Sequence, residues 1–545
     1  MDSLSTELSP TSRRPATDAL DRLTGLGWSG GLAAILLALA ASFALLGYTT
    51  VYWRHADMDF MVIYSSLALN DGQPQQFFDH PAYLTIVAVR LWLKALHTLG
   101  LLDAASLGTL PPASDVAAFD AAMTHVVRAA RLVSFATTLA FVSVFAVLVR
   151  RLVRDWRVAL LATFAFAFSG GIAVHLRILR SELIAACFVL FALMLLIAAG
   201  RRASTLRPLV AGSAAALCVL ALENKVHAIL LIAALPVLLL PFGGPESASK
   251  PFWRSGFGWG AALATALVAA LAVTAAAPLV ASGLDPAALA AAGLKPALAG
   301  RIGIVQAGMI AWSGAGMMAY ALTWRISAAE TITSMGAMLT GASLALLTLL
   351  FNYNINDIVV VLNPLEKMLS YVDASGASAT SGGPAATIWL ILDGIRLVLM
   401  RLTFVLYSSP RPTVFLTWLI LPGIIYGWRR GERQAALQAT LLLGAAIGID
   451  ALGVRRGLKS EYFVFTDPLI ILAGAVLLDR LADLARLRLA YPIAIALMVL
   501  HVTISQAEPV RYALKRSGPQ DICEWNVAYM PRLPVPWCAE PKPAP

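Results

Sequence analysis

Long apolar runs separated by short polar stretches occupy most of the 545-residue chain. A helix of about 20 apolar residues is long enough to cross a lipid bilayer. Runs near that length occur at 28–48, 132–149, 158–174, 183–199, 208–222, 226–240, 257–281, 302–322, 332–351, 414–428, 435–452, 469–487 and 490–506. The pattern predicts an all-α polytopic membrane protein with about 13 transmembrane helices.

Two further apolar segments, 83–102 and 386–407, carry several charges and are not predicted to span. In the first, the spacing of Arg90, Lys94 and His97 places all three on one face of a helix. Such a helix is typical of a segment that lies along the membrane surface. We expect both segments to be amphipathic helices on the outer side, because a span at either would invert the charge alternation of the following loops.

Composition fits a membrane protein and argues against a series of soluble domains. Apolar residues make up 59% of the chain and charged residues 13%, whereas soluble domains have about 25% charged residues. The net charge is +10, and the basic residues gather in every second loop, as in the cytoplasmic loops of membrane proteins. The charge therefore does not indicate nucleic acid as a partner.

Loop charges also predict the topology. With the N-terminus in the cytoplasm, an odd number of spans places the C-terminus outside. The outer loop after the ninth run contains a Gly/Ser/Ala-rich stretch, 373–384, which suits either a linker or a lid. The predicted divisions are a cytoplasmic tail (1–26), a membrane module (27–506) with long outer loops (49–131 and 352–413), and an outer C-terminal tail (507–545).

The outer tail contains two of the four cysteines, Cys523 and Cys538. An outer location would expose them to an oxidising compartment, where disulfides form and persist. We therefore expect these two residues to be bonded, the alternative being two unpaired thiols.

Two acidic residues, Asp57 and Asp59, follow the first predicted span closely. With an extended backbone they point the same way as His55, and with a helical backbone they diverge. A carboxylate at a membrane surface suits a general base, because partial desolvation raises its pKa towards neutrality. The alternative is a pair of solvated loop acids.

Basic residues also occur at the outer ends of spans, against the general trend. Six of them together would make a site for an anion such as a lipid phosphate. Alternatively, they pair with Glu182, Glu223 and Glu461 or extend towards the membrane surface. The six are Arg177, Arg180, Lys225, Arg455, Arg456 and Lys459. Arg177 and Arg180 are close enough in sequence to face one phosphate together.

Several short motifs share their order with a known superfamily. An acidic residue after the first span is followed by Tyr64, by a helical segment that ends at Gly72, and by Asp79-His80-Pro81 before an amphipathic helix. Later segments are Leu176-Arg177-Ile178-Leu179-Arg180-Ser181-Glu182, Glu223-Asn224-Lys225-Val226-His227 and the stretch 459–468. This order resembles the GT-C glycosyltransferases, in particular the protein mannosyltransferase and lipid A aminoarabinose transferase branch.

The resemblance implies a GT-C-like fold and transfer of a sugar from a polyprenyl-phosphate carrier to a lipid, glycan or protein acceptor at the outer membrane face. The reaction would be an inverting displacement with Asp59 or Asp57 as the base. The implied substrate-binding residues are Arg177, Arg180, Glu182, Lys225, His227, His80, Tyr83, Arg456, Lys459 and Tyr462. The Ala/Leu/Arg-rich composition favours a bacterial inner membrane.

Departures from the family pattern leave the sugar and the acceptor open. The first loop has Asp-Met-Asp where the mannosyltransferases have Asp-Glu, Ala82 stands where Pro is common, and the C-terminal tail is shorter than the soluble domain of the aminoarabinose transferases.

No cofactor is expected, because the chain lacks a Walker A sequence and a Gly-x-Gly-x-x-Gly turn after a strand. A divalent cation on His55, Asp57, Asp59, Asp79 and His80 is a weaker hypothesis, since no His-Glu-x-x-His or Cys/His framework is present. The remaining histidines, His97, His125, His175 and His501, are expected to be structural or interfacial.

Two other classes of protein remain as alternatives. A transporter or flippase of a lipid-linked saccharide would favour ionisable residues in the middle of spans, whereas here the charges gather at the outer ends of spans. A non-catalytic assembly subunit would tolerate substitution of the acidic loop.

Overall fold

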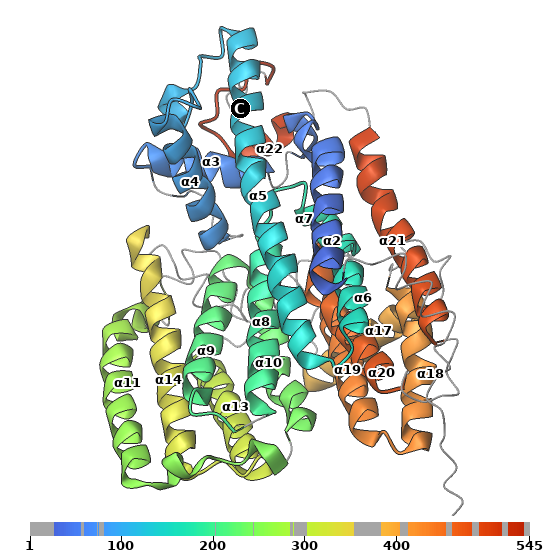
Figure 1. Ribbon diagram of the computed structural model, residues 1–545. Helices are drawn as coiled ribbons and strands as arrows, with labels where there is room; N and C mark the ends of the chain where they lie inside the picture. The colour runs from blue at the N-terminus through green and yellow to red at the C-terminus, as the bar shows by residue number, and fades with distance from the viewer. Residues whose placement is uncertain are drawn as a thin grey trace, which may run out of the picture.

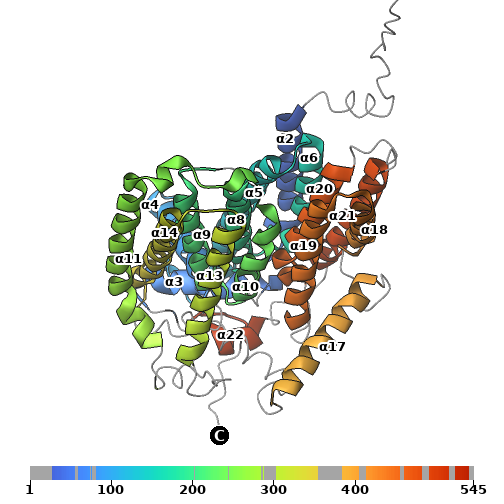
Figure 2. The ribbon, with the colours of Figure 1, turned by 90° about the horizontal axis from the view of Figure 1, so that it is seen from below.

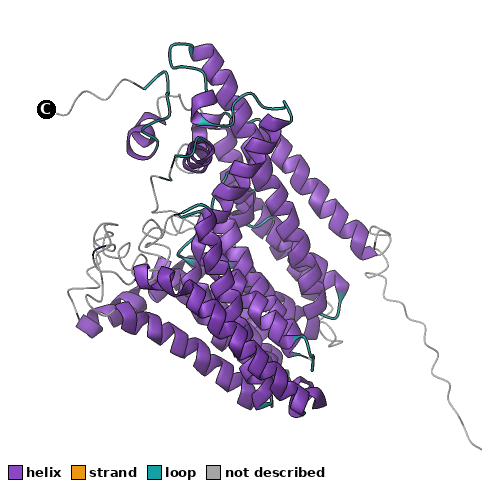
Figure 3. Ribbon diagram, turned by 90° about the vertical axis from the view of Figure 1, so that its left-hand side faces the viewer, coloured by secondary structure: helices purple, strands orange, loops and turns teal. Residues whose placement is uncertain are grey.

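A computed structural model describes residues 27–55, 59–73, 75, 81–201, 203–243, 245–283, 287, 302–353, 383–403, 413–453, 460–481, 490–514 and 522–538. These residues are helical or lie in loops and turns, and they contain no strand (Figure 3). Six helices are long and apolar enough to cross a membrane, and three shorter apolar helices accompany them. The chain is therefore a multi-pass, all-α membrane protein.

The six long helices begin with α2 (Gly27–Phe43), which a π-helical turn (Ala44–Tyr48) continues. The others are α5 (Val116–Leu152), α8 (Glu182–Gly200), α11 (Gly256–Gly283), α14 (Ala328–Leu347) with the short helix η7 (Thr348–Phe351), and α19 (Arg433–Gly453).

The remaining helices include shorter apolar ones and those of the loops between them. They are α3 (Asp59–Asn70), α4 (Tyr83–Thr98), α6 (Trp156–Ala167), α7 (Gly170–His175), α9 (Arg207–Asn224), α10 (Ala228–Leu239), α13 (Ile302–Thr323), α17 (Gly383–Thr403), α18 (Val414–Arg430), α20 (Asp467–Leu481), α21 (Ala490–Leu514) and α22 (Cys523–Tyr529). The described part of every run that we predicted to span lies on a helix or a pair of helices, and residues 482–487 of the run at 469–487 lie outside the described residues. The amphipathic segments fall on α4 and α17.

The run at 158–174 does not form one continuous helix. α6 ends at Ala167, and α7 begins after Ser169, whose hydroxyl accepts a hydrogen bond from the backbone N–H of Ile172 (3.4 Å). This capping residue interrupts an otherwise apolar run. α7 ends at His175, and α8 begins at Glu182 after the turn at residues 176–181.

α5 is longer than the predicted span at 132–149. Asp115 starts it by accepting a hydrogen bond from the backbone N–H of Ala118 (3.0 Å). Its 37 residues make a helix about 55 Å long, whereas the hydrocarbon core of a bilayer is about 30 Å thick. The first half of α5 therefore projects beyond the bundle.

That projecting half helps to build a lobe at one end of the molecule (Figure 1). We use "the lobe" for the described residues of 52–131 together with 522–538. Its core packs Phe119 and Met123 of α5 against Leu67 of α3, Val89 of α4 and Ile522 near the C-terminus. Residues from both ends of the sequence thus share one hydrophobic core.

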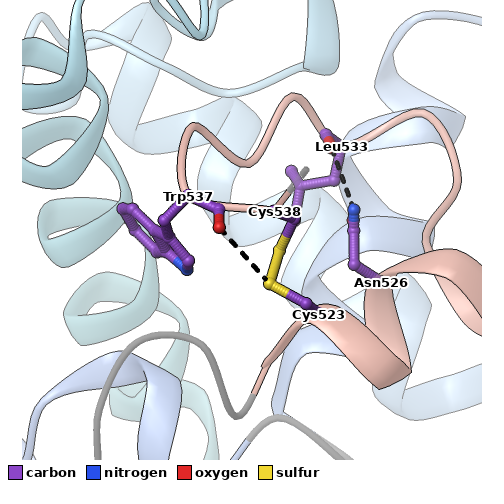
Figure 4. Close-up of a disulfide and its surroundings, with 5 residues drawn as sticks. All are labelled: Cys523, Asn526, Leu533, Trp537 and Cys538. Carbon is purple, nitrogen blue, oxygen red and sulfur yellow. Dashed lines mark hydrogen bonds between the residues drawn. A yellow bond between two sulfur atoms is a disulfide. The ribbon is translucent and has the colours of Figure 1, made fainter. Parts of the chain in front are cut away.

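A disulfide between Cys523 and Cys538 closes the C-terminal part of the lobe, which confirms the predicted pairing (Figure 4). Nearby, the amide of Asn526 donates a hydrogen bond to the carbonyl oxygen of Leu533 (3.4 Å). Trp537 packs its ring near Tyr52 (6.2 Å between ring centroids). The tail is therefore held against the first loop of the lobe.

The bundle below the lobe has two groups of helices (Figure 2). In one, α11, α14, α9 and α8 pack in a row, and in the other α17 to α21 pack together. Two sets of contacts join the groups. α10 packs against α19, and the 3-10 helix η10 (Ser460–Phe465) packs against α7 and α8. The candidate site lies where they meet.

Small residues allow α9 and α14 to approach closely. A methyl group on Gly341 would overlap the carbonyl oxygen of Gly212. Close approach through small residues is a common way for helices to pack in membranes, because lipid provides no hydrophobic driving force between helices.

Candidate functional site

Asp59 is the first residue of α3 and is completely buried. Its Oδ2 accepts a hydrogen bond from Nε of Arg131 on α5 (2.9 Å) and forms an ion pair with a terminal nitrogen of the same guanidinium at 2.7 Å. Its Oδ1 accepts one from the backbone N–H of Leu179 (2.6 Å). Arg131 also donates to the carbonyl oxygens of Thr50 and Gly47. Asp59 therefore ties α3, α5 and the 176–181 turn together.

Of the two predicted bases, the structure describes Asp59 and not Asp57. Asp59 has donors on both carboxylate oxygens and no contact with solvent. Asp57 lies outside the described residues, as do the predicted substrate-binding residues His80, Arg456 and Lys459. The side chain of His55 and the residue Asp79 are likewise not described.

A second buried group of charges forms around Glu182, the first residue of α8. Its Oε1 lies 2.8 Å from Nζ of Lys225, and its Oε2 lies 3.3 Å from Nε of Arg180. The terminal nitrogen of Arg180 lies 3.4 Å from Oε1 of Glu461. We call these four residues the charge cluster. It brings together the 176–182 segment, the turn between α9 and α10, and η10.

The structure shows the partners of two of these basic residues. The alternative that they pair with neighbouring carboxylates is confirmed for Arg180 and Lys225. Burial alone would lower the pKa of Arg180, but the carboxylates of Glu182 and Glu461 outweigh it and raise that pKa. Arg180 thus remains charged in a largely buried place.

The end of α9 positions Lys225. The side chain of Asn224 donates to the carbonyl oxygen of Ser181 (2.7 Å) and to Thr85 of α4 (3.1 Å). Its backbone carbonyl accepts a hydrogen bond from Ala82 (3.0 Å), which has a left-handed backbone with φ of 48°. The start of α4, the end of α9 and the entry to α8 are therefore fixed to one another.

Tyr83 follows this junction and packs on Tyr353, with 5.4 Å between ring centroids. Tyr83 donates a hydrogen bond to the carbonyl oxygen of Thr348, and Tyr353 donates one to Oε1 of Gln75 (2.6 Å). Burial raises the pKa of both tyrosines, so each hydroxyl keeps its proton. Glu223, close by, is completely buried, and neither of its carboxylate oxygens has a hydrogen-bond partner in the described part of the chain.

Tyr462 separates the charge cluster from a small pocket. Its ring stacks on His227 (4.7 Å between centroids), and Nζ of Lys225 lies 5.8 Å from its centroid. The pocket is mostly apolar and is lined by His227, Leu230, Ile449, Asp450, Gly453, Tyr462 and Phe465. Two of the predicted substrate-binding residues thus share a pocket beside the cations.

Arg177 is directed elsewhere. Its guanidinium donates to the hydroxyl of Ser42 (2.6 Å), to Oε1 of Gln506 (3.2 Å) and to the carbonyl oxygen of Ala173. Burial lowers its pKa to about 10, so it remains protonated at neutral pH. The structure gives Arg177 and Arg180 different partners and does not bring them to one group.

Sequence reasoning did not single out Arg131 or His175. Arg131 follows Arg128 by three residues at the start of an apolar run, and its position on the predicted outer side was the available signal. His175 donates from Nδ1 to the carbonyl oxygen of Gly171 (2.6 Å), and its Nε2 lies 3.8 Å from Oε2 of Glu182. A single histidine in an apolar run gave no sign of this contact.

The structure does not test the metal hypothesis. Four of the five proposed ligands have undescribed positions or side chains, and Asp59 is engaged by Arg131. Within the described ranges, no group of three or more His, Cys, Asp or Glu side chains is arranged to hold a metal ion.

No protein-family model and no curated protein matches the chain. The chain is similar to the Archaeoglobus fulgidus oligosaccharyltransferase in complex with zinc and sulfate, with a TM-score of 0.42, 13% identity, and coverage of 94% of this chain and 59% of that chain. It is similar to AglB from the same organism, in complex with an inhibitory peptide and a dolichol-phosphate, with a TM-score of 0.42, 12% identity, and coverage of 96% and 62%. The chain thus spans about three fifths of the length of these structures.

Proposed function

We propose that this protein is a membrane glycosyltransferase of the GT-C type. It transfers a sugar from a polyprenyl-phosphate carrier to a lipid, glycan or protein acceptor at the outer face of the membrane. One observation carries the proposal: the acidic first loop meets the buried cations at a single turn. Asp59 accepts a hydrogen bond from Leu179 (2.6 Å), and the next residue, Arg180, belongs to the charge cluster.

This arrangement suits displacement of a phosphate-linked sugar. The acceptor oxygen attacks the anomeric carbon as the bond from that carbon to the phosphate oxygen breaks, which inverts the configuration. Negative charge then develops on the departing polyprenyl phosphate. Arg180 and Lys225 stabilise that charge, and Lys225 does so strongly because its surroundings exclude water.

We assign the general base to Asp57 and a positioning role to Asp59. The enclosure of Asp59 supports this division, because donors occupy both of its carboxylate oxygens. Asp57 takes the proton of the acceptor hydroxyl. The other proposed contacts to donor or acceptor come from Arg177, Glu182, His227, His80, Tyr83, Arg456, Lys459 and Tyr462.

The proposed location is a bacterial inner membrane, with about 13 crossing helices, the N-terminus in the cytoplasm and the lobe outside. The bonded Cys523 and Cys538 support an oxidising compartment around the C-terminal tail. The lobe and the charge cluster then share the side on which polyprenyl-phosphate donors present their sugars.

Sugar release from a panel of radiolabelled polyprenyl-phosphate sugars tests the proposal, with the purified protein in liposomes. We expect Asp57→Asn to lower donor consumption by about 10²–10⁴-fold, the usual contribution of a general base, while donor binding persists. Asp103→Asn, an exposed acid of the same lobe, is the matched control and should consume donor normally.

Three results would contradict the proposed reaction or the roles assigned to Asp57 and Asp59. Near-normal consumption by the Asp57→Asn/Asp59→Asn double variant would remove the acidic loop from the mechanism. Loss of activity in Asp59→Asn alone, with unchanged stability, would make Asp59 the base. Counterflow of labelled donor without sugar release would favour a flippase.

A further inference from the structure

The charge cluster already contains a carboxylate for each of its cations. Arg180 and Lys225 face Glu182 and Glu461, and both Lys225 and Glu182 are at most 1% exposed. A phosphate that enters this site adds negative charge to a buried group that has no cation to spare. Burying uncompensated charge is strongly unfavourable. Binding therefore requires a further positive charge or the loss of a negative one.

His175 is placed to supply that charge. A carbonyl oxygen only accepts hydrogen bonds, so the contact with Gly171 O (2.6 Å) assigns the proton of the neutral ring to Nδ1. The lone pair of Nε2 then faces Oε2 of Glu182 at 3.8 Å. Nε2 is buried and has no hydrogen-bond partner in the described part of the chain. A proton added there would turn an unfavourable contact into an ion pair.

We propose that binding of the donor phosphate is coupled to the uptake of one proton at Nε2 of His175. This inference rests on the proposed function. The proton comes from the outer solvent, and the Nδ1 proton stays on its hydrogen bond to Gly171. The imidazolium then neutralises part of Glu182, which leaves Lys225 and Arg180 available to the phosphate. His175 is a positioning residue, because it acts through Glu182.

Other charged or titratable groups on the elements around α7 have partners of their own. They are Arg131 on α5, paired with Asp59; Arg157 at the start of α6, over Trp156; His501 on α21, in contact with the carbonyl oxygen of Ala165; Arg177, bonded to Ser42 and Gln506; and Glu461 and Tyr462 on η10, beside Arg180 and Lys225. Among the described residues, Glu182 is the acid recorded within ion-pair distance of His175.

Calorimetric titration with farnesyl phosphate, a short polyprenyl phosphate, tests the coupling on the full-length protein in nanodiscs. Binding heats in two buffers of different ionisation enthalpy give the number of protons taken up. Working above pH 7 keeps the probe fully ionised, because the second pKa of a phosphate monoester is about 6. We expect about one proton per ligand, and a dissociation constant that rises towards tenfold per pH unit.

His175→Asn separates this role from a structural one, because the Asn amide keeps an N–H for Gly171 and lacks a titrating nitrogen. We expect the variant to take up no proton and to bind with a nearly pH-independent affinity. The matched control is His501→Gln, another buried histidine bonded to a carbonyl oxygen, which should behave as the wild type.

The outcomes distinguish this inference from the proposed function. Binding by the wild type without proton uptake, or unchanged uptake in His175→Asn, would overturn the inference alone. Failure of the wild type to bind farnesyl phosphate would overturn the proposed function and the inference with it. The wild-type measurements decide the question even if His175→Asn does not fold.

Discussion

The ion pair of Asp59 and Arg131 joins α3 to α5 inside the lobe, and both side chains are completely buried. Removing one partner would leave a buried charge unpaired, which costs about 3–5 kcal/mol. We therefore expect Arg131→Met to lower the free energy of unfolding by about that amount. Equilibrium unfolding in detergent micelles, followed by tryptophan fluorescence, measures it.

A second substitution tests the reason for that loss. Replacing both partners, in Asp59→Leu/Arg131→Met, removes the unpaired charge and should recover most of the stability. Arg128→Met is the matched control, because the Arg128 guanidinium lies over the ring of Tyr48 and no ion pair joins it to the residues that the structure describes. A double variant as unstable as Arg131→Met would show that packing, not charge, explains the loss.

The residues of the site were largely visible in the sequence, whereas their contacts were not. Arg180, Glu182, Lys225 and Glu461 stand out because charges are rare beside apolar runs. Arg180 and Glu182 are near neighbours in sequence, but the pairs of Lys225 with Glu182 and of Arg180 with Glu461 depend on segments that are distant in sequence. So does the bond from Arg131 to Asp59, which joins residues 72 positions apart. Local patterns carry no information on such contacts.

At the scale of elements, the close packing of α9 on α14 predicts that a larger residue at their contact destabilises the protein. A glycine with open space beside it provides the control. Gly341 has no room for a side chain against Gly212, whereas Gly444 on α19 faces open space. We expect Gly341→Leu to destabilise the protein by about 1–3 kcal/mol or more, because overpacking forces the helices apart. Gly444→Leu should change the melting temperature little. Equal melting temperatures for the two variants would contradict this packing.

Helices were predicted better than their ends. Apolar runs predict where a helix lies, because a buried or lipid-facing segment must satisfy its own backbone hydrogen bonds. The early start of α5 escaped prediction, because residues 116–131 mix polar and apolar side chains and become helical against the lobe. The break between α6 and α7 was hidden by the apolar residues that surround Ser169.

At the scale of the whole molecule, the disulfide holds the C-terminal tail onto the lobe. The bond closes a loop of 15 residues, and closing a loop of that length contributes about 3 kcal/mol. We expect Cys523→Ser/Cys538→Ser to open the tail locally. Hydrogen exchange of residues 522–538 should become faster by up to about 100-fold, which corresponds to about 3 kcal/mol.

The free cysteine Cys218 provides the control, since Cys218→Ala alters no disulfide. Unchanged exchange in the disulfide variant would mean that packing alone retains the tail. Amides in α8 should be unaffected in either variant, because the tail packs on the lobe and not on that helix.

Release of the tail should affect transfer more than donor binding. Arg532 in the tail donates a hydrogen bond to Gln73 (2.7 Å), and Trp537 packs beside Trp53, close to the acidic loop in sequence. The charge cluster, in contrast, is held by α8, the α9–α10 turn and η10. The disulfide variant should therefore bind farnesyl phosphate like the wild type and consume donor more slowly. A parallel loss of binding would place the tail in contact with the phosphate site.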